Sequence, residues 1–539
     1  MRFEPRVERP ASLTIGWTAG LILAAAYVLT LGLLSPLTLQ DYPAHLANAV
    51  ALSDLVFHGG ARFGEIFSFH FLFVPYFLGD LGFAVMVEAF GPKAGGAAWL
   101  TIVLLSVPCA LIVFMRITGV ISERRPLVFI LSLYLATDWF FLMGFLSFRL
   151  GIAVTIVNLA LMTLLRNRWS TRAFVAYAVL VVLGYLVHLT TLAFLGVAVG
   201  VSGLLRLWRR TSDVRTEALL VAPIATMCAW HFGVAVGYTL PGDPIENPYV
   251  WGTLFGKLIR LNYEFVRFDI RRDVPMMIGL AACMLMSAGR VRLRDLRESA
   301  VLEMLVLALA FVVVYVALPM GYSEAWYVDV RALALVSVSV ILACANLPAR
   351  FSWRRIPGSA LATVPAVALV AANLAYLKRE LTPDQAWLTQ YRAIIASIPV
   401  GAHVLPVTTL ESQGHISPFR HAHAFITIDR EGLMPYAFTA DTANPEKYLR
   451  YVHKPYAPPE VWYIDRTGGV DWRLVARDYD YLLVQQPFDA RRIPLPTIPM
   501  ARNGSAALLA IDKSAPVPAP NTTSPLLTRI PRVRQEELP

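Results

Sequence analysis

Runs of about twenty mostly apolar residues recur along the first 377 positions and alternate with short segments that are rich in Arg. A helix needs about 20 such residues to cross the hydrocarbon core, where every backbone polar group must be paired within the segment. The pattern therefore predicts eleven transmembrane helices, over residues 12–35, 96–115, 126–142, 149–165, 173–187, 189–205, 219–239, 274–289, 301–319, 332–347 and 358–377.

One further apolar segment, residues 71–90, carries Pro75, Asp80 and Glu88 and is open to two interpretations, a twelfth span or a helix on the membrane surface. Cytoplasmic loops carry an excess of Lys and Arg. If this segment crossed, the Arg clusters that follow it would face outward; if it lies on the surface, they face the cytoplasm. We therefore place it on the surface, among the amphipathic helices of an outer loop at about 36–95, and the N-terminus in the cytoplasm.

An odd number of spans puts residues 378–513 on the opposite, periplasm-like face. Residues 385–398 in this part have helical spacing. The short apolar or alternating runs that are typical of strands are HVLPV (403–407), AFITI (424–428), DYLLVQ (480–485) and AALLAI (506–511). The pattern predicts a small extracytoplasmic α/β domain after a membrane domain of residues 1–377. Residues 514–539 are rich in Pro, Ser, Thr and Arg, which predicts a disordered tail.

The composition supports a protein that is integral to a bacterial-type inner membrane. Of the 539 residues, 57% are apolar and 16% charged, against roughly 25% charged residues in soluble domains. This excludes an ordinary water-soluble enzyme. The net charge of +10 comes from Arg residues between the apolar segments, where they set topology against anionic headgroups, so we expect no nucleic-acid partner. All four Cys lie in apolar stretches without metal-site spacing, which predicts neither a disulfide nor a metal site from them.

The first candidate chemistry follows the first predicted span. Asp41 comes directly after it, and His45 lies one helical turn later, on the same side of a helix over residues 42–56. A carboxylate and an imidazole at this face could act in general-base catalysis. Alternatively, Asp41 caps the helix, with Pro43 in the first turn, and the spacing alone favours this cap.

This arrangement resembles the GT-C superfamily of polyprenyl-phosphate-sugar-dependent glycosyltransferases, and in layout its protein O-mannosyltransferase and lipid A aminoarabinose transferase branch. The similar features are a retained first span, an acidic residue directly after it, an amphipathic outer-loop helix and the stretch VPYFLGDLGFAVMVEAFG at 74–91. The resemblance implies a polyprenyl-phosphate-linked sugar as donor, an extracytoplasmic lipid, glycan or protein as acceptor, and Asp41 as the catalytic base.

A second similar segment is LATDWFFLMGFLSFRLG (135–151), which places Asp138 at the outer end of a span, where the family has a Thr-Asp pair. The resemblance implies that Asp41 and Asp138 flank one outward cavity, with Asp138 orienting the acceptor or helping to hold a metal. Two carboxylates permit a divalent metal ion without requiring one. The alternative is a simple helix-end acid beside Trp139 at the membrane interface.

Candidates for binding the lipid phosphate and the sugar follow from the same resemblance. Arg331 opens the span in YVDVRALALVSVSVIL, as an Arg-Tyr-x-x-Pro motif does in the family, and an Arg fork pairs with two phosphate oxygens. His188 lies where the branch has a Lys-Gly at the head of a span; it is either a phosphate ligand or a packing residue. Arg149 is a further phosphate candidate. Tyr322 and Trp326 could stack on a sugar ring, although aromatic residues are common at any membrane interface.

Other chemistry and other functions remain open at this stage. His415, His421 and His423 form a local cluster, but no Cys or carboxylate stands at zinc-site spacing, so a polar loop is favoured over a metal site. The rival functions are a transporter or flippase of lipid-linked sugars, and a non-catalytic envelope assembly protein. Transporters often have charges or broken helices at mid-membrane and internal repeats. Here the notable charges lie at the outer ends of spans, which favours glycosyl transfer.

Overall fold

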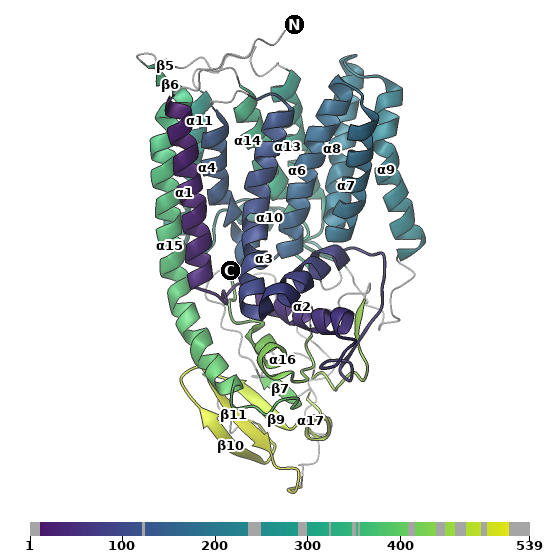
Figure 1. The fold of residues 1–539 in the computed structure, drawn as a ribbon, viewed down its shortest axis with the longest axis vertical. Coiled ribbons are helices and arrows are strands. Elements are labelled where there is room, and N and C mark those ends of the chain that lie inside the picture. Colours follow the sequence, from purple (N-terminus) through teal and green to yellow (C-terminus); the bar gives the residue numbers. More distant parts are fainter. Residues whose placement is uncertain are drawn as a thin grey trace. The chain divides into compact units, whose positions relative to one another are not determined.

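The chain is mostly helical in a computed structural model (Figure 1). The structure describes residues 11–120, 124–235, 249–288, 299–322, 325–347, 352–353, 356–407, 416–437, 448–458, 470–486 and 493–516. His415 and residues 517–539, which make up most of the predicted tail, lie outside the described residues.

The chain divides into two compact units. Unit 1 consists of Met1–Leu33, Phe73–Gly79 and Ala98–Lys378, and unit 2 of Leu34–Leu72, Asp80–Ala97 and Arg379–Pro539. Most of the predicted outer loop is therefore part of the same unit as the C-terminal segment. One local reason is backbone pairing, because β1 (Phe67–Phe69) and β8 (Leu449–Tyr451) form an antiparallel ladder.

Unit 1 is built from helices of widely differing length. They are α1 (Ala11–Leu33), the C-terminal part of α3 (Phe77–Ile117), α4 (Arg125–Ala136), α5 (Trp139–Leu142), α6 (Leu146–Asn167), α7 (Thr171–Val187), α8 (Leu189–Trp208), α9 (Val214–Gly233), α10 (Leu254–Arg260), α11 (Ile270–Ala288), α13 (Ser299–Ala317), α14 (Arg331–Asn346) and the first part of α15 (Gly358–Ile395). Unit 1 also holds the short strands β2 (Tyr249–Val250), β3 (Gly321–Tyr322) and β4 (Ala325–Trp326), which form one antiparallel sheet, and the β5 (Ser352–Trp353) and β6 (Ile356–Pro357) pair.

Ten of the eleven predicted apolar ranges each fall mainly on one helix, namely α1, α3, α6, α7, α8, α9, α11, α13, α14 or α15. The range 126–142 is not a single helix, because Thr137 and Asp138 separate α4 from α5. Among the described residues, six helices are long and apolar enough to cross a membrane, namely α1, α3, α6, α8, α13 and α15. Helices α4, α7 and α14 are apolar but shorter. The predicted class, a helical protein with several candidate membrane spans, is confirmed; the number of eleven crossings stays a prediction.

Buried ion pairs connect four helices of unit 1. Arg166 of α6 bonds to Glu217 of α9 at 2.6 Å and to Glu303 of α13 at 3.3 Å, and Arg206 of α8 bonds to the same Glu303 at 2.8 Å. Removing such charges from water is costly unless each one is paired and hydrogen-bonded. These helices therefore have one favourable arrangement, the one in which all four charges meet.

In unit 2, helix α2 (Tyr42–Phe57) packs closely on α3. A side chain at Gly96 would place its Cβ 2.3 Å from the Tyr42 hydroxyl oxygen, so the buried Tyr42 side chain would have to shift. Helix α3 is interrupted at Gly91, where φ is 76° and ψ is 167°, a conformation that L side chains rarely adopt. The apolar segment 71–90 therefore ends at a kink and does not run straight into the next part of α3.

The C-terminal part of unit 2 contains a four-stranded sheet. Its strands are β7 (Val404–Val407), β9 (Tyr481–Gln485), β10 (Thr497–Arg502) and β11 (Ala506–Ile511), in the order β10-β11-β9-β7, with β7 parallel to β9 and the other pairs antiparallel. Helix α17 (Trp472–Asp478) contributes Val475 to the buried core, which also contains Leu405, Leu482 and Leu509. Three of the predicted strand-like runs are strands.

One expectation for this part was wrong. The run 424–428 is not a strand: it follows the 3₁₀ turn η3 (Ala422–Ala424) and belongs to α16 (Phe425–Arg430). Its residues are buried on consecutive positions, so the apolar run alone cannot distinguish a strand from a buried helical turn. The helical spacing of residues 385–398 is confirmed as far as Ile395, where α15 ends after running without interruption from Gly358 (Figure 1).

Candidate active site

Asp41 stands at the first position before α2, and the local sequence explains why the helix begins there. Pro43 occupies the first turn, where the missing N–H costs nothing. Asp41 has φ −95° and ψ −7°, and its side chain makes no capping hydrogen bond to the helix. The capping interpretation, which the spacing favoured, is therefore wrong. The carboxylate therefore makes no hydrogen bond to the helix terminus.

The side chain beside Asp41 comes from the C-terminal segment. Nε2 of His421, the residue before η3, lies 3.5 Å from Oδ1 of Asp41, and both side chains are about a tenth exposed. Burial, with the nearby His423, Arg420 and His45, lowers the pKa of His421 well below its usual range. At neutral pH a neutral imidazole therefore faces the carboxylate, and it can donate one N–H without forming an ion pair.

A second imidazole–carboxylate pair lies in the same unit. Nδ1 of His45 is 3.8 Å from Oδ1 of Asp80, which is at the start of α3. The Tyr448 hydroxyl donates a hydrogen bond to the other oxygen of Asp80. Sequence analysis treated Asp80 only as a charge against membrane crossing, and no motif ties it to His45. Sequence spacing could therefore not indicate that Asp80 is the partner of His45.

The histidines of the C-terminal segment are buried, and the expected polar loop is wrong. His421 is 9% exposed and His423 is 1% exposed, and their rings lie 5.9 Å apart. Burial also lowers the pKa of His423 to about 3. Within the described part of the chain, no group of three or more His, Cys, Asp or Glu side chains could hold a metal ion. The pairing of a carboxylate with an imidazole suits proton transfer at Asp41.

In unit 1 the structure brings together two of the phosphate candidates. Arg331 begins α14, and its Nη1 lies 3.4 Å from Nε2 of His188, the residue between α7 and α8. The other ring nitrogen of His188 accepts a hydrogen bond from the Thr190 backbone N–H at 3.1 Å, which fixes the ring. The Arg331 guanidinium also lies over the rings of Phe145 and Phe148, at 5.0 and 5.7 Å. A cation held on two aromatic faces keeps its fork oriented.

Asp138 and Arg149 form a buried ion pair in the same unit. Asp138 caps the short helix α5, because its Oδ1 accepts from the Phe141 backbone N–H at 2.9 Å. The Arg149 guanidinium donates to the other oxygen, and both side chains are 2% exposed. Nε and Nη2 of Arg149 are buried without a hydrogen-bond partner among the described residues. Asp138 is thus more than the expected helix-end acid, and Arg149 retains two donors for an anion.

Sequence analysis missed Glu264, which lies in the long loop between α10 and α11. Its carboxylate accepts a hydrogen bond from Ser337 of α14, and its backbone carbonyl accepts one from Trp139 at 3.1 Å. Burial, with the neighbouring Asp138 carboxylate, raises the pKa of Glu264 to about 8. No spacing or motif marks this residue, since only the fold places it beside Asp138.

Tyr322 and Trp326 lie on the β3–β4 hairpin that precedes α14. They are 49% and 42% exposed. The Tyr322 ring lies 5.1 Å from that of Tyr249 on the adjacent β2, and Nη2 of Arg331 donates to the Trp326 carbonyl at 3.4 Å. The hairpin therefore carries two partly exposed rings, and the backbone of Trp326 contacts Arg331.

Comparison with known proteins supports the fold at low sequence identity. No protein-family model matches the chain, and no curated protein sequence is significantly similar to it. The structure of ArnT from Cupriavidus metallidurans in the apo state matches 93% of this chain and 99% of that chain, with a TM-score of 0.54 and 14% identity. The structure of the same protein bound to undecaprenyl phosphate matches 92% and 97%, with a TM-score of 0.52 and 14% identity.

A third structure, of the arabinofuranosyltransferase AftD from Mycobacteria, matches 94% of this chain and 42% of that chain, with 14% identity and a TM-score of 0.45. This score is too low to support an argument, and the comparison rests on the ArnT structures. They come from the branch that the sequence pattern resembles. The chain thus shares the fold of the two ArnT structures.

Proposed function

We propose that the protein is a membrane glycosyltransferase that moves a sugar from a polyprenyl-phosphate carrier to an extracytoplasmic acceptor, with Asp41 as general base. The observation that carries this proposal is the placement of Asp41: a nearly buried carboxylate that does not cap its helix and has a neutral imidazole 3.5 Å away. A carboxylate oriented in this way is suited to remove a proton from a hydroxyl group.

The proposed reaction is a single displacement at the sugar. The acceptor hydroxyl gives its proton to Asp41 while its oxygen bonds to the anomeric carbon. The bond between that carbon and the phosphate oxygen breaks, and its electron pair leaves with polyprenyl phosphate. The lipid phosphate gains one negative charge in this step, so fixed cations near it lower the barrier.

Arg331 is the best-supported ligand for the lipid phosphate, with His188 beside it and Arg149 as a further candidate. The fold is that of a protein with a structure bound to undecaprenyl phosphate, which supports a lipid of this class as partner. Tyr322 and Trp326 are proposed to stack on the sugar. The charge pattern favours a cytoplasmic N-terminus and an extracytoplasmic unit 2.

Replacing Arg331 by Gln is expected to lower kcat/KM for the lipid-linked donor by about 10- to 100-fold, because a charged hydrogen bond contributes about 1.5–3 kcal/mol. Arg331→Lys should recover only part of this loss, since it keeps the charge without the planar fork. Initial rates at varied donor concentration measure the effect. Arg172→Gln, an exposed Arg of α7, is the matched control. Equal losses in both variants would contradict the assignment.

Replacing His421 by Phe is expected to lower kcat about tenfold and to move the acid limb of the pH–rate profile to higher pH. The reason is that an N–H donor stabilises the ionised carboxylate of Asp41 and resists its protonation. Because the pKa of His421 is well below its usual range, the imidazole stays neutral in the pH range where a free histidine would become protonated. His421→Gln, which keeps a donor, should retain most of the rate. A profile that does not move in the Phe variant would argue against this role.

The reaction class is tested with the purified full-length protein, membrane extract as acceptor source and a panel of polyprenyl-phosphate sugars labelled in the sugar. At least one donor should pass its label to the acceptor fraction, and the corresponding nucleotide sugars should not. Absence of transfer with every donor, from a folded protein, would count against the proposal.

A further inference from the structure

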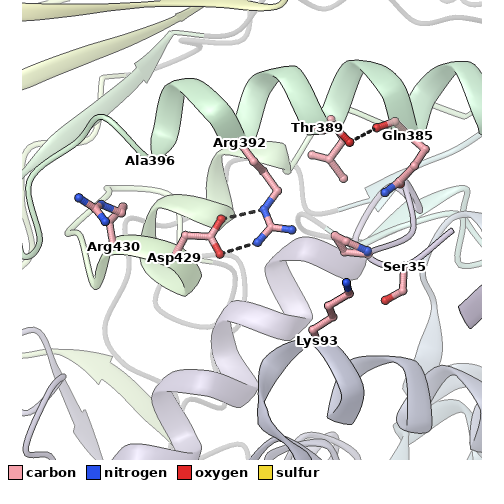
Figure 2. A pocket seen from close by; sticks show the side chains of 10 residues that line it. Ser35, Lys93, Gln385, Thr389, Arg392, Ala396, Asp429 and Arg430 are labelled. Atoms are coloured by element: carbon pink, nitrogen blue, oxygen red, sulfur yellow. Dashed lines mark hydrogen bonds and ion pairs between the residues drawn. The ribbon is translucent and has the colours of Figure 1, made fainter. Parts of the chain in front are cut away.

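Unit 2 contains a pocket of about 500 Å³ that belongs to neither set of residues described above. It is lined by α15, by α3, by the segment that leads from α1 toward α2, and by the C-terminal end of α16. Figure 2 shows Arg392 reaching into it from α15 and Lys93 reaching toward it from α3. The pocket is large enough for a small polar molecule or a lipid head group.

The charge of the pocket is positive. Its lining includes three cationic side chains, Lys93, Arg392 and Arg430, and a single carboxylate, Asp429. That carboxylate is fully used by Arg392, whose Nε and Nη2 donate to its two oxygens at 2.8 and 2.7 Å. Neither Lys93 nor Arg430 has an ion-pair partner within the part of the chain that the structure describes. Two cationic side chains are thus left without a counter-charge.

A hydroxyl group in the pocket points to the same kind of ligand. Ser35 is 9% exposed, and its Oγ is buried without a hydrogen-bond partner among the described residues. A buried hydroxyl without a partner loses the free energy of a hydrogen bond unless a ligand or water supplies one. Thr389 also lines the pocket, but its hydroxyl already donates to the Gln385 carbonyl.

We propose that this pocket binds a phosphate monoester group, carried by a soluble sugar phosphate or by a lipid head group. At neutral pH a phosphate monoester has a charge of about −1.5 to −2, which is opposite in sign to the net charge of the lining. Its three terminal oxygens can accept from the Lys93 ammonium, the Nη1 of Arg392 and the Ser35 hydroxyl. A carboxylate has less charge and fewer acceptor oxygens, and so would leave more of these donors unused.

The pocket shares two chain segments with the Asp41 pair. Ser35 and Asp41 lie on the same segment between α1 and α2, and Asp429 and Arg430 end the helix that follows His421 and η3. A ligand held in the pocket would therefore order both segments that carry the proposed base and its imidazole. The binding itself does not depend on the proposed function and is measured without turnover.

The first arm uses equilibrium dialysis of ³²P-orthophosphate against the purified full-length protein in detergent. Wild type should bind one phosphate, and Lys93→Gln should weaken binding about tenfold. Ser35→Ala should weaken it about threefold, because a neutral hydroxyl contributes less than a charged donor. Lys454→Gln, an exposed lysine of the same unit outside the pocket, should bind as wild type does. This result would support the proposal and would show that the pocket can take its phosphate group from a soluble molecule.

The second arm uses the full-length protein in nanodiscs of phosphatidylcholine with either phosphatidic acid, a monoester, or phosphatidylglycerol, a diester. If the head group is the source, phosphatidic acid raises the unfolding midpoint of wild type and of Lys454→Gln but not of Lys93→Gln. The proposal is overturned if Lys93→Gln equals wild type in both arms, or if neither phosphate nor phosphatidic acid binds. If wild-type protein binds phosphate but transfers no sugar from any donor, the proposed function at Asp41 is contradicted. The proposed phosphate site is then unaffected.

Discussion

Replacement of Asp41 by Asn is expected to lower kcat for sugar transfer by about 10²- to 10⁴-fold, the range that a positioned general base contributes. The amide is nearly isosteric with the carboxylate but cannot take the acceptor proton. Because Asp41 makes no capping bond to α2, the loss should come without a loss of helix stability. Single-turnover transfer from preformed donor complex measures the chemical step directly.

The control for this variant lies at the other end of the same helix. Asp54 is as buried as Asp41, and its Oδ2 accepts from the backbone N–H groups of Arg62 and Phe63 at 3.1 and 2.9 Å. Asp54→Asn should therefore reduce stability and leave the rate of the chemical step nearly unchanged. If Asp41→Asn retained the wild-type rate, Asp41 would not be the base.

Replacement of Arg149 by Met is expected to lower the free energy of unfolding by about 3–5 kcal/mol, the cost of leaving one buried charge without its partner. Asp138 would then be a 2% exposed carboxylate that keeps only the α5 backbone bonds. The double variant Asp138→Asn with Arg149→Met should be less destabilised than the single one, since no unpaired charge remains. Unfolding of the full-length protein in detergent measures these differences.

Comparing the stabilities of the single and double variants distinguishes a structural role of Arg149 from a role in ligand binding alone. The exposed Arg172 of α7 provides the control, because Arg172→Met should be neutral. If Arg149→Met were as stable as this control, the ion pair with Asp138 would contribute nothing to folding. Its two donor atoms without a partner among the described residues, Nε and Nη2, would then favour a ligand-binding role.

The long apolar helices of unit 1 were predictable because their signal is local. Each needs only a run of apolar residues of sufficient length, and the break at His188 appears where the chain becomes extended between α7 and α8, with φ −164° and ψ 130°. Arg331 and His188 were also found as single candidates through the resemblance. That they meet at 3.4 Å depends on packing between helices 143 positions apart, which no local pattern contains.

The candidate site in unit 2 was only half predictable. Asp41 is conspicuous after the first span, whereas His421 lies 380 positions later in a segment that reads as a polar loop. The sequence likewise gives no sign that residues 34–72 pair with the C-terminal segment, since the β1–β8 ladder has only three residues on each strand. That Asp41 and Asp138 flank one outward cavity stays a prediction.

The central claim is tested most directly in proteoliposomes that contain the full-length protein and a polyprenyl-phosphate sugar labelled with ¹⁴C in the sugar and ³H in the lipid. The account predicts that ¹⁴C passes to the acceptor while one ³H-labelled polyprenyl phosphate is released for each sugar, and that both products disappear in Asp41→Asn. Movement of the intact donor across the bilayer, with both labels together and equally in wild type and Asp41→Asn, would contradict the account and identify a transporter.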